Sequence, residues 1–175
     1  MRRNNNRYTS PAIALHWLIA ALIAFLFGLG WYMVDLPKGP VRTPYFSLHK
    51  SIGLTVAGLA LLRLLWRLGH RPPALPETMP AWQRRAAGFS HTLLYVFMFL
   101  QPVSGYVSSS FSGYTTKYFG IPLPNWGWKD QILNELFTEI HVVSSVILLS
   151  LIVVHVSAVI LHASRRDGVA GRMLP

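Results

Sequence analysis

Residues 141–155 read HVVSSVILLSLIVVH, an apolar run that begins and ends with a histidine. In an α-helix each residue turns by about 100° and rises by about 1.5 Å. The 14-residue spacing of His141 and His155 therefore puts both side chains within about 40° of one face, and about 21 Å apart along the axis. Ionisable side chains in an apolar helix are costly, and two on one face indicate a functional site. The stretch predicts a helix that presents one imidazole near each end.

Three further apolar stretches of similar length accompany this one. We predict helices at about residues 12–34, 48–68, 89–107 and 137–162, each close to the length of about 20 residues that crosses a bilayer. The chain of 175 residues is 52% hydrophobic and 13% charged, whereas soluble domains have about 25% charged residues. The sequence therefore predicts an all-α fold, an integral membrane four-helix bundle formed as a single domain over residues 1–175. Residues 69–87 are expected to form an irregular loop, and residues 108–135 are expected to form the longest connection.

The basic residues are distributed unequally between the two sides of the predicted bundle. The side with both termini carries ten, and the opposite side carries five. The positive-inside bias then places both termini in the cytoplasm. The formal net charge of +10 reflects this orientation, so nucleic acid is not an expected partner. The ten are Arg2, Arg3, Arg7, Arg67, Arg71, Arg84, Arg85, Arg165, Arg166 and Arg172, and the five are Lys38, Arg42, Lys50, Lys117 and Lys129.

Two more histidines fall at levels that match the first two. His16 begins the first helix on the cytoplasmic side, which is the level of His155. His49 begins the second helix on the outer side, which is the level of His141. Two imidazoles fall short of the roughly four ligands that zinc prefers, whereas heme supplies four nitrogens and needs two axial ligands. Cysteine is absent, which excludes covalent c-type attachment, so we predict two noncovalent heme b groups.

Four other residues could serve these hemes. Gly53, one turn beyond His49, could leave room for a flat macrocycle or could allow close helix packing. Gly105 offers the same choice in the third helix. Arg63 lies 14 residues after His49 and could pair with a heme propionate or extend to the cytoplasmic surface. His91 could replace the first-helix histidine as a ligand, contact a propionate or serve a quinone.

The chain resembles the bacterial cytochrome b561 family over nearly its whole length. The resemblance implies a multi-pass protein of the bacterial inner membrane, a quinone-linked diheme cytochrome. It also implies hemes on the two histidine pairs described above. Some members of similar size are superoxide oxidases, which take an electron from superoxide at the outer face and reduce ubiquinone. The residues that carry the resemblance are Tyr8–Ser10, Ala14–Trp17, His49–Gly53, Arg63–Arg67, His91, Gln101–Tyr106, His141 and His155.

Three functions follow as alternatives. The first is an oxidoreductase that passes electrons from superoxide to ubiquinone, for which the five outer basic residues would attract the anion. Four acidic residues in the same segments nearly offset them: Asp35, Asp130, Glu135 and Glu139. The second is an electron carrier, a subunit that anchors a periplasmic dehydrogenase or hydrogenase through residues 108–135. The third, a non-redox membrane protein, leaves the histidines unexplained. The expected partners are membrane lipid, quinone, and either superoxide or a periplasmic redox protein.

Overall fold

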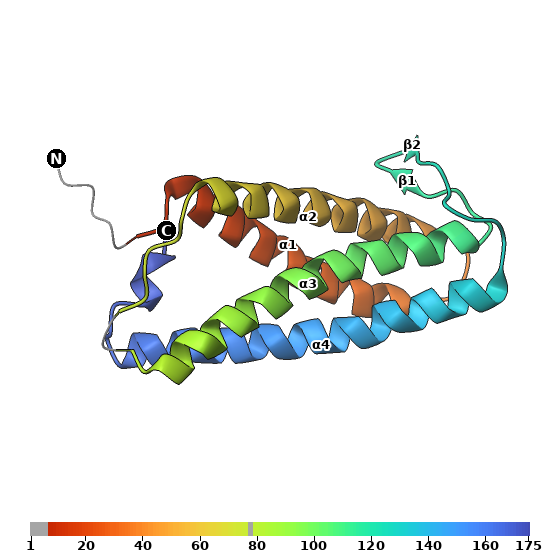
Figure 1. Cartoon of the computed structure of the whole chain (residues 1–175). Helices are drawn as coiled ribbons and strands as arrows, with labels where there is room; N and C mark the ends of the chain where they lie inside the picture. The colour runs from red at the N-terminus through yellow and green to blue at the C-terminus, as the bar shows by residue number, and fades with distance from the viewer. Residues whose placement is uncertain (1–6, 77–78) are drawn as a thin grey trace.

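The computed structural model describes residues 7–76 and 79–175. Within them, four long helices account for most of the chain (Figure 1): α1 (Ser10–Asp35), α2 (Thr43–Gly69), α3 (Ala81–Phe111) and α4 (Gln131–Ser164). All four are long and apolar enough to cross a membrane. The predicted helical architecture with four membrane-spanning helices is confirmed. Arg2 and Arg3, which the charge count includes, lie outside the described residues.

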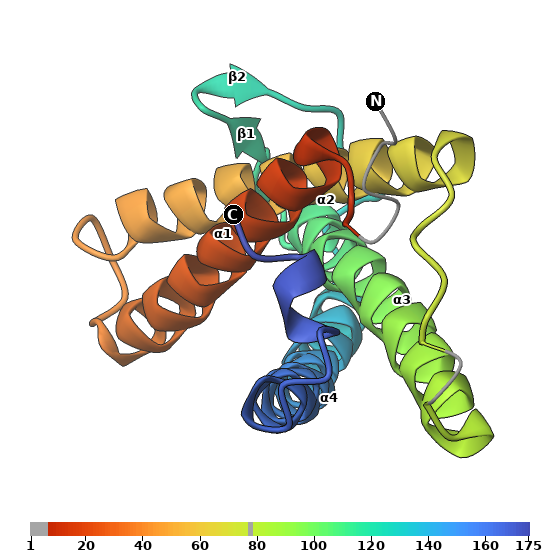
Figure 2. The same cartoon turned by 90° about the vertical axis from the view of Figure 1, so that its left-hand side faces the viewer.

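The bundle has two ends that carry different features. At one end, called the termini end, α1 begins and α4 ends, and the short 3-10 helix η1 (Ala170–Arg172) lies beyond α4. At the other, called the hairpin end, β1 (Lys117–Tyr118) and β2 (Ile121–Pro122) extend from the connection between α3 and α4. Figure 2 looks along the bundle from the termini end. The two ends can therefore be compared with the two sides that the sequence distinguishes by their basic residues.

The helices extend beyond the predicted apolar spans. The helix α3 begins at Ala81 rather than at about residue 89, and α4 begins at Gln131 rather than at about residue 137. Segments 69–87 and 108–135 are thus partly helical, and the prediction of an irregular loop over residues 69–87 is wrong from Ala81 onward. Hydropathy marks only the part of a helix that suits lipid, whereas the extra turns carry polar residues. Local signals start them: Pro80 precedes α3, and the Asp130 side chain accepts the Leu133 N–H at 3.0 Å to cap α4.

The hairpin is a short antiparallel pair with Lys117 opposite Pro122 and Tyr118 opposite Ile121. Its two turn residues have positive φ, 45° at Phe119 and 92° at Gly120, as tight two-residue hairpin turns require. The Phe119 N–H donates to the Ser51 hydroxyl at 3.0 Å. This bond attaches the hairpin to the first turns of α2.

The helices pack as two pairs with one further contact between them. The helix α1 packs on α2, α3 packs on α4, and α2 also contacts α3. Among the described residues, α4 makes no close backbone contact with either α1 or α2. The contacts between α4 and those two helices are therefore made by side chains.

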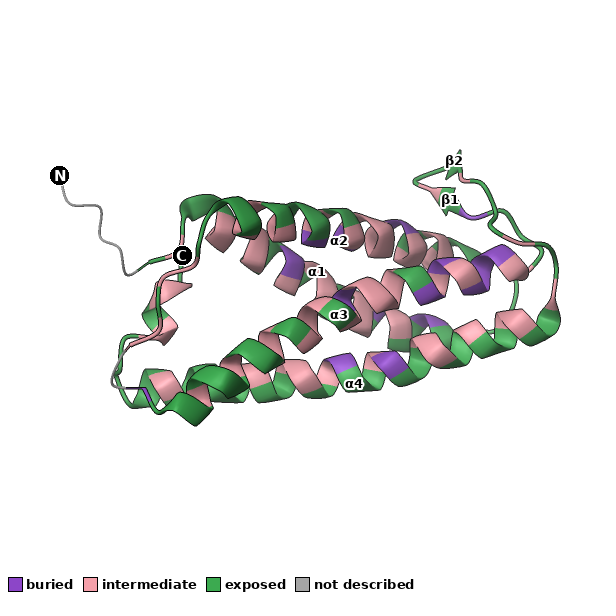
Figure 3. Cartoon of the chain, viewed as in Figure 1, coloured by how far each residue is buried: buried purple, intermediate pink, exposed green. Residues whose placement is uncertain are grey.

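Four of the buried apolar residues form one layer near the middle of the bundle. Each helix contributes one residue to this central core layer, namely Ile19, Val56, Met98 and Leu148. Beyond it, buried residues concentrate on α3 toward the hairpin end, as Figure 3 shows. The first turns of α3, at the termini end, are mostly exposed. The two ends therefore differ in how tightly their side chains are enclosed.

Candidate heme sites

Each helix carries two candidate site residues 14 positions apart, one toward each end of the bundle. On α4 the central core residue Leu148 lies midway between the two histidines. The same spacing relates His16 to Gly30, His49 to Arg63 and His91 to Gly105. The hairpin end therefore combines Gly30, His49, Gly105 and His141, and the termini end combines His16, Arg63, His91 and His155.

At the hairpin end the predicted partners His49 and His141 face each other. Their ring centroids are 6.3 Å apart, with the planes at 77°. The Nδ1 atom of His141 lies 2.9 Å from the Gln101 carbonyl oxygen. Because a carbonyl only accepts, Nδ1 carries the proton and donates, which leaves the lone pair of Nε2 available to a metal. The Gln101 amide also donates to the His141 carbonyl at 3.0 Å, so α3 fixes this imidazole.

Glycines stand against both imidazoles at this end. A Cβ placed on Gly105 would lie 3.1 Å from Cε1 and Nδ1 of His141, and one on Gly30 would lie 3.5 Å from Cε1 of His49. Gly30 was not predicted as a site residue, although the sequence shows its 14-residue spacing from His16. A Cβ on Gly53 would meet nothing within 4 Å. The space beside Gly53 is therefore open. This disfavours the alternative interpretation, in which Gly53 allows two helices to pack closely.

At the termini end three imidazoles converge. The ring centroids of His16 and His155 are 6.3 Å apart, at 75°, the same separation as in the other pair. His91 also approaches His155, with centroids 5.5 Å apart. His91 thus belongs to this cluster, and its three possible roles remain to be separated by experiment.

Two arginines lie beside this cluster, and neither pairs with a carboxylate of the described residues. The guanidinium carbons of Arg63 and Arg67 lie 5.6 and 5.9 Å from the ring centroid of Tyr95, within the range of cation–π contacts. The Tyr95 hydroxyl is buried and has no hydrogen-bond partner in the part of the chain that the structure describes. The one ion pair among the described residues joins His162 to Asp167. Arg63 and Arg67 therefore offer unpaired positive charge at the termini end, which suits a propionate.

The two remaining histidines of the sequence lie apart from both clusters. His70 stacks on Trp66 with ring centroids 4.0 Å apart. His162 holds Asp167 by a contact of 2.5 Å between Nδ1 and Oδ2. The hydrogen bond from His162 is the main reason that the pKa of the Asp167 carboxyl lies below its ordinary value.

The geometry of both pairs fits a six-coordinate heme. Two metal–imidazole bonds of about 2 Å each, extended from the bonded nitrogens to the ring centres, give a separation close to the observed 6.3 Å. Each pair also joins α4 to a helix with which, among the described residues, it makes no close backbone contact, so a broad group can lie between them. Within the described part of the chain, no cluster of three or more His, Cys, Asp or Glu side chains could hold a metal ion. A group that brings its own four nitrogens matches this donor set.

Comparisons with known proteins give the family. A sequence model of the prokaryotic cytochrome b561 family matches residues 7–175. Cytochrome b561 homolog 1 of Escherichia coli (strain K12) is 26% identical over 178 residues, which cover 97% of this chain and 98% of that protein. Cytochrome b561 homolog 2 of the same organism is 36% identical over 122 residues, which cover 65% of this chain and 61% of that protein.

With four helices able to span a membrane, these matches fit a multi-pass protein of the bacterial inner membrane. The family name implies a heme of b type and a role in electron transport. The chain belongs to the prokaryotic cytochrome b561 family.

Proposed function

We propose that this protein is a diheme cytochrome that carries electrons from superoxide at the hairpin end to ubiquinone in the membrane. The observation that carries the proposal is the equal geometry of the two histidine pairs, each with ring centroids 6.3 Å apart. When bound, heme iron accepts and returns one electron. Two axial imidazoles leave no open coordination position, so each pair favours electron transfer over oxygen binding.

The residues of each end have separate roles in this proposal. His49 and His141 would hold the heme of the hairpin end, and His16 and His155 the heme of the termini end. The matching 6.3 Å separations favour His16 over His91 as the ligand opposite His155. Further residues would assist: Arg63 would bind a propionate, Gly53 would leave room for the macrocycle, and His91 would contact the heme edge or its propionate.

We place the termini end in the cytoplasm and the hairpin end outside. Eight of the ten basic residues assigned to the cytoplasmic side are described, and they lie in or beside the segments at the termini end. Both termini would then be cytoplasmic. A donor generated outside the cell membrane would reach the hairpin end first.

The basic residues of the hairpin end support a small anion as donor. In the described residues none of them forms an ion pair. Two of the nearby carboxylates are engaged by their own helix: Asp130 caps α4, and Glu135 accepts the Gln131 amide at 2.8 Å. The Nε of Arg42 is buried and has no hydrogen-bond partner among residues 7–76 and 79–175. Positive charge at this end is therefore available to attract superoxide.

Stopped-flow mixing tests this donor. Superoxide added to the oxidised holoprotein should reduce heme, at a rate that falls with ionic strength because exposed charges are screened. The double substitution Arg42→Ala and Lys129→Ala should slow the reaction several-fold and leave the absorption spectrum unchanged. Arg165→Ala with Arg166→Ala removes the same charge from the termini end and should not slow it. Heme reduction that persists in the presence of superoxide dismutase would exclude superoxide.

Heme stoichiometry is a separate test of the two-site proposal. A pyridine hemochrome assay on the purified protein should give two hemes per chain. Acid-acetone should extract both, because the chain has no cysteine to attach them. One heme per chain, or heme that stays with the protein, would contradict the proposal.

Exposed aromatic side chains at the hairpin end support a second function. Trp126 and Trp128 are 64% and 70% exposed, and Phe119 in the hairpin turn is 59% exposed. An electron-transfer subunit could use such a surface to dock a periplasmic dehydrogenase or hydrogenase. Under this reading the protein purifies from its native membrane with a stoichiometric redox partner. Trp126→Ser with Trp128→Ser should then release the partner and leave heme content unchanged.

A further inference from the structure

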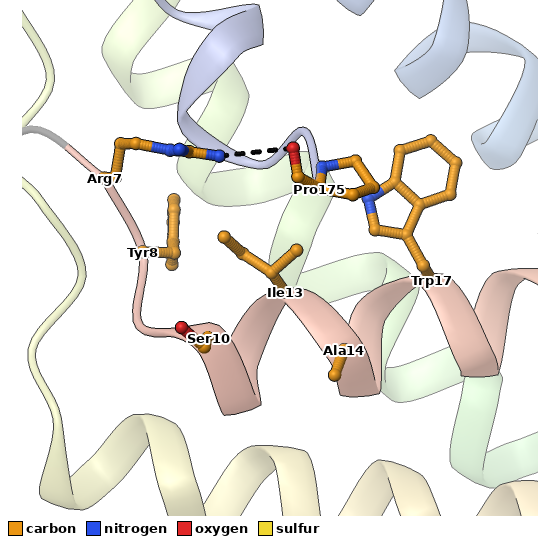
Figure 4. A pocket seen from close by; sticks show the side chains of 7 residues that line it. All are labelled: Arg7, Tyr8, Ser10, Ile13, Ala14, Trp17 and Pro175. Atoms are coloured by element: carbon orange, nitrogen blue, oxygen red, sulfur yellow. Dashed lines mark hydrogen bonds between the residues drawn. The ribbon is translucent and has the colours of Figure 1, made fainter.

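A cavity of ≈ 560 Å³ lies beside the first turns of α1 at the termini end (Figure 4). This volume falls within the range of small-molecule sites. One wall is the α1 surface, and the segment after η1 closes the other side. The lining residues are Arg7, Tyr8, Ser10, Ile13, Ala14, Trp17 and Pro175.

Several hydrogen bonds hold that closing segment in place. The Trp17 indole donates to the Met173 carbonyl at 2.8 Å, and the Arg7 guanidinium donates to the Leu174 carbonyl at 2.6 Å. The backbone N–H of Tyr8 adds a bond to the Arg172 carbonyl at 3.2 Å. The cavity wall is thus built by contacts between segments far apart in the chain.

The lining is mainly apolar, with a few hydrogen-bond donors. Ile13, Ala14 and Trp17 supply apolar surface, and Tyr8 and Ser10 are the lining residues that carry hydroxyl groups. No Asp or Glu side chain is among the described residues that line the cavity. The single guanidinium already donates to backbone carbonyls, which disfavours a lipid phosphate. A neutral, flat molecule with carbonyl acceptors matches this lining best.

The cavity adjoins the proposed heme ligand of the termini end. The Trp17 ring lies edge-on to the His16 ring, with centroids 5.6 Å apart. One aromatic side chain therefore separates the cavity from the imidazole. Trp17 is also 45% exposed on the apolar outer face of α1. A substrate dissolved in lipid can reach the cavity from the side.

We propose that this cavity binds the benzoquinone head group of the electron acceptor. The proposal rests on the proposed function and assigns its quinone site. In the overall reaction, two superoxide anions at the hairpin end each lose one electron and become dioxygen. The quinone gains these two electrons, one at a time, through the side of Trp17 that faces His16. Two protons from the aqueous phase at the termini end complete the quinol.

A filling substitution tests the site independently of superoxide. Ala14→Phe places a ring in the cavity, whereas Ala24→Phe places the same ring on an exposed part of α1 away from it. Decylubiquinol is mixed with the oxidised holoprotein, and heme reduction and decylubiquinone binding are both measured. We expect Ala14→Phe to weaken binding and slow reduction roughly tenfold, which corresponds to about 1.4 kcal/mol. Ala24→Phe should match the unmodified protein.

Three outcomes would overturn the assignment, and they differ in meaning. Equal behaviour of the two phenylalanine variants places the quinone site elsewhere and leaves the proposed function intact. An unmodified protein that neither binds decylubiquinone nor accepts electrons from the quinol overturns both. Loss of co-purifying phospholipid from Ala14→Phe, with quinone exchange unchanged, identifies a lipid site. Should Ala14→Phe fail to fold, Tyr8→Phe removes one hydroxyl alone and should still weaken quinone binding by several-fold.

Discussion

The two ends of the bundle use the same helices and the same 14-residue spacing, yet they surround their histidines differently. At the hairpin end two glycines stand against the two imidazoles, and a backbone carbonyl fixes His141. At the termini end three imidazoles converge, with two arginines nearby. At the hairpin end, packing sets the positions of the imidazoles. At the termini end, the two arginines set the local charge.

This difference suggests a direction for electron flow. Positive charge near a redox centre stabilises the reduced form, which carries one more negative charge. Arg63 and Arg67 should therefore raise the reduction potential at the termini end. Electrons entering at the hairpin end would then move toward the quinone cavity beside Trp17.

Substitution of a single proposed heme ligand should have the largest effect on heme content. It also tests whether the histidines are paired as proposed. We expect His49→Ala and His141→Ala each to lose the same heme, that of the hairpin end, because each removes one of two axial ligands. At the termini end, His16→Ala should lose the other heme, whereas His91→Ala should retain it. Heme content with low-temperature absorption spectra measures these results. Spectrally different losses from the first two variants would contradict the pairing.

A pair of glycine substitutions tests control by packing at the hairpin end. Gly105→Ala puts a methyl group 3.1 Å from the His141 ring, and such overpacking costs about 1–3 kcal/mol. We expect partial heme loss and a shifted electron paramagnetic resonance signal for that heme. Gly30→Ala places its methyl group at an ordinary contact distance of 3.5 Å from His49 and serves as the matched control. Equal effects of the two variants would show that the close approach to His141 is unimportant.

Neutralisation of an arginine tests control by charge at the termini end. Arg63→Gln should lower the reduction potential of that heme, because it removes a cation that favours the reduced form. A loss of about 1 kcal/mol corresponds to roughly 40 mV for one electron. Spectroelectrochemical titration of both hemes measures the shift, and the hairpin-end heme is the internal control. A larger shift at the hairpin end would reverse the assignment of Arg63.

The pH dependence of the His162–Asp167 contact should be the smallest effect. Its hydrogen bond lowers the pKa of Asp167, so its stabilisation is present at neutral pH and is lost as the pH falls through that lowered pKa. Asp167→Asn should lower the melting temperature by less than about 2 °C at neutral pH, because the contact is near the surface. The difference should vanish in acid. A heme spectrum that changes with this substitution would link the contact to the termini-end site.

The sequence alone predicted the features that depend on periodicity. The apolar spans locate the four helices, and the spacing of His141 and His155 on one helix sets two levels. Chain direction then assigns His16 and His49 to those levels, and the structure brings these partners to equal distances. Such features follow from helix geometry and need no knowledge of which helices touch.

Other features depended on contacts that hydropathy does not report. The role of Gly30 requires knowing that α1 faces His49. The first turns of α3 are polar and exposed, so no apolar signal marks them. The hairpin is two residues per strand, too short for a visible alternation. The closure of the cavity by Met173 and Leu174 joins segments far apart in the sequence, and no local pattern indicates that contact.

The separation of α4 from α1 and α2 has a consequence for the life of the protein in the cell. One layer of four apolar residues holds the middle of the bundle, and the histidine pairs reach across where backbones do not meet. Heme binding would therefore add to the stability of the fold, by mass action on the native state. Newly made chains would mature or be degraded according to how much heme the cell can spare. Immunoblots from a heme-auxotrophic strain should show protein abundance rising with graded 5-aminolevulinate, and constant abundance would contradict this dependence.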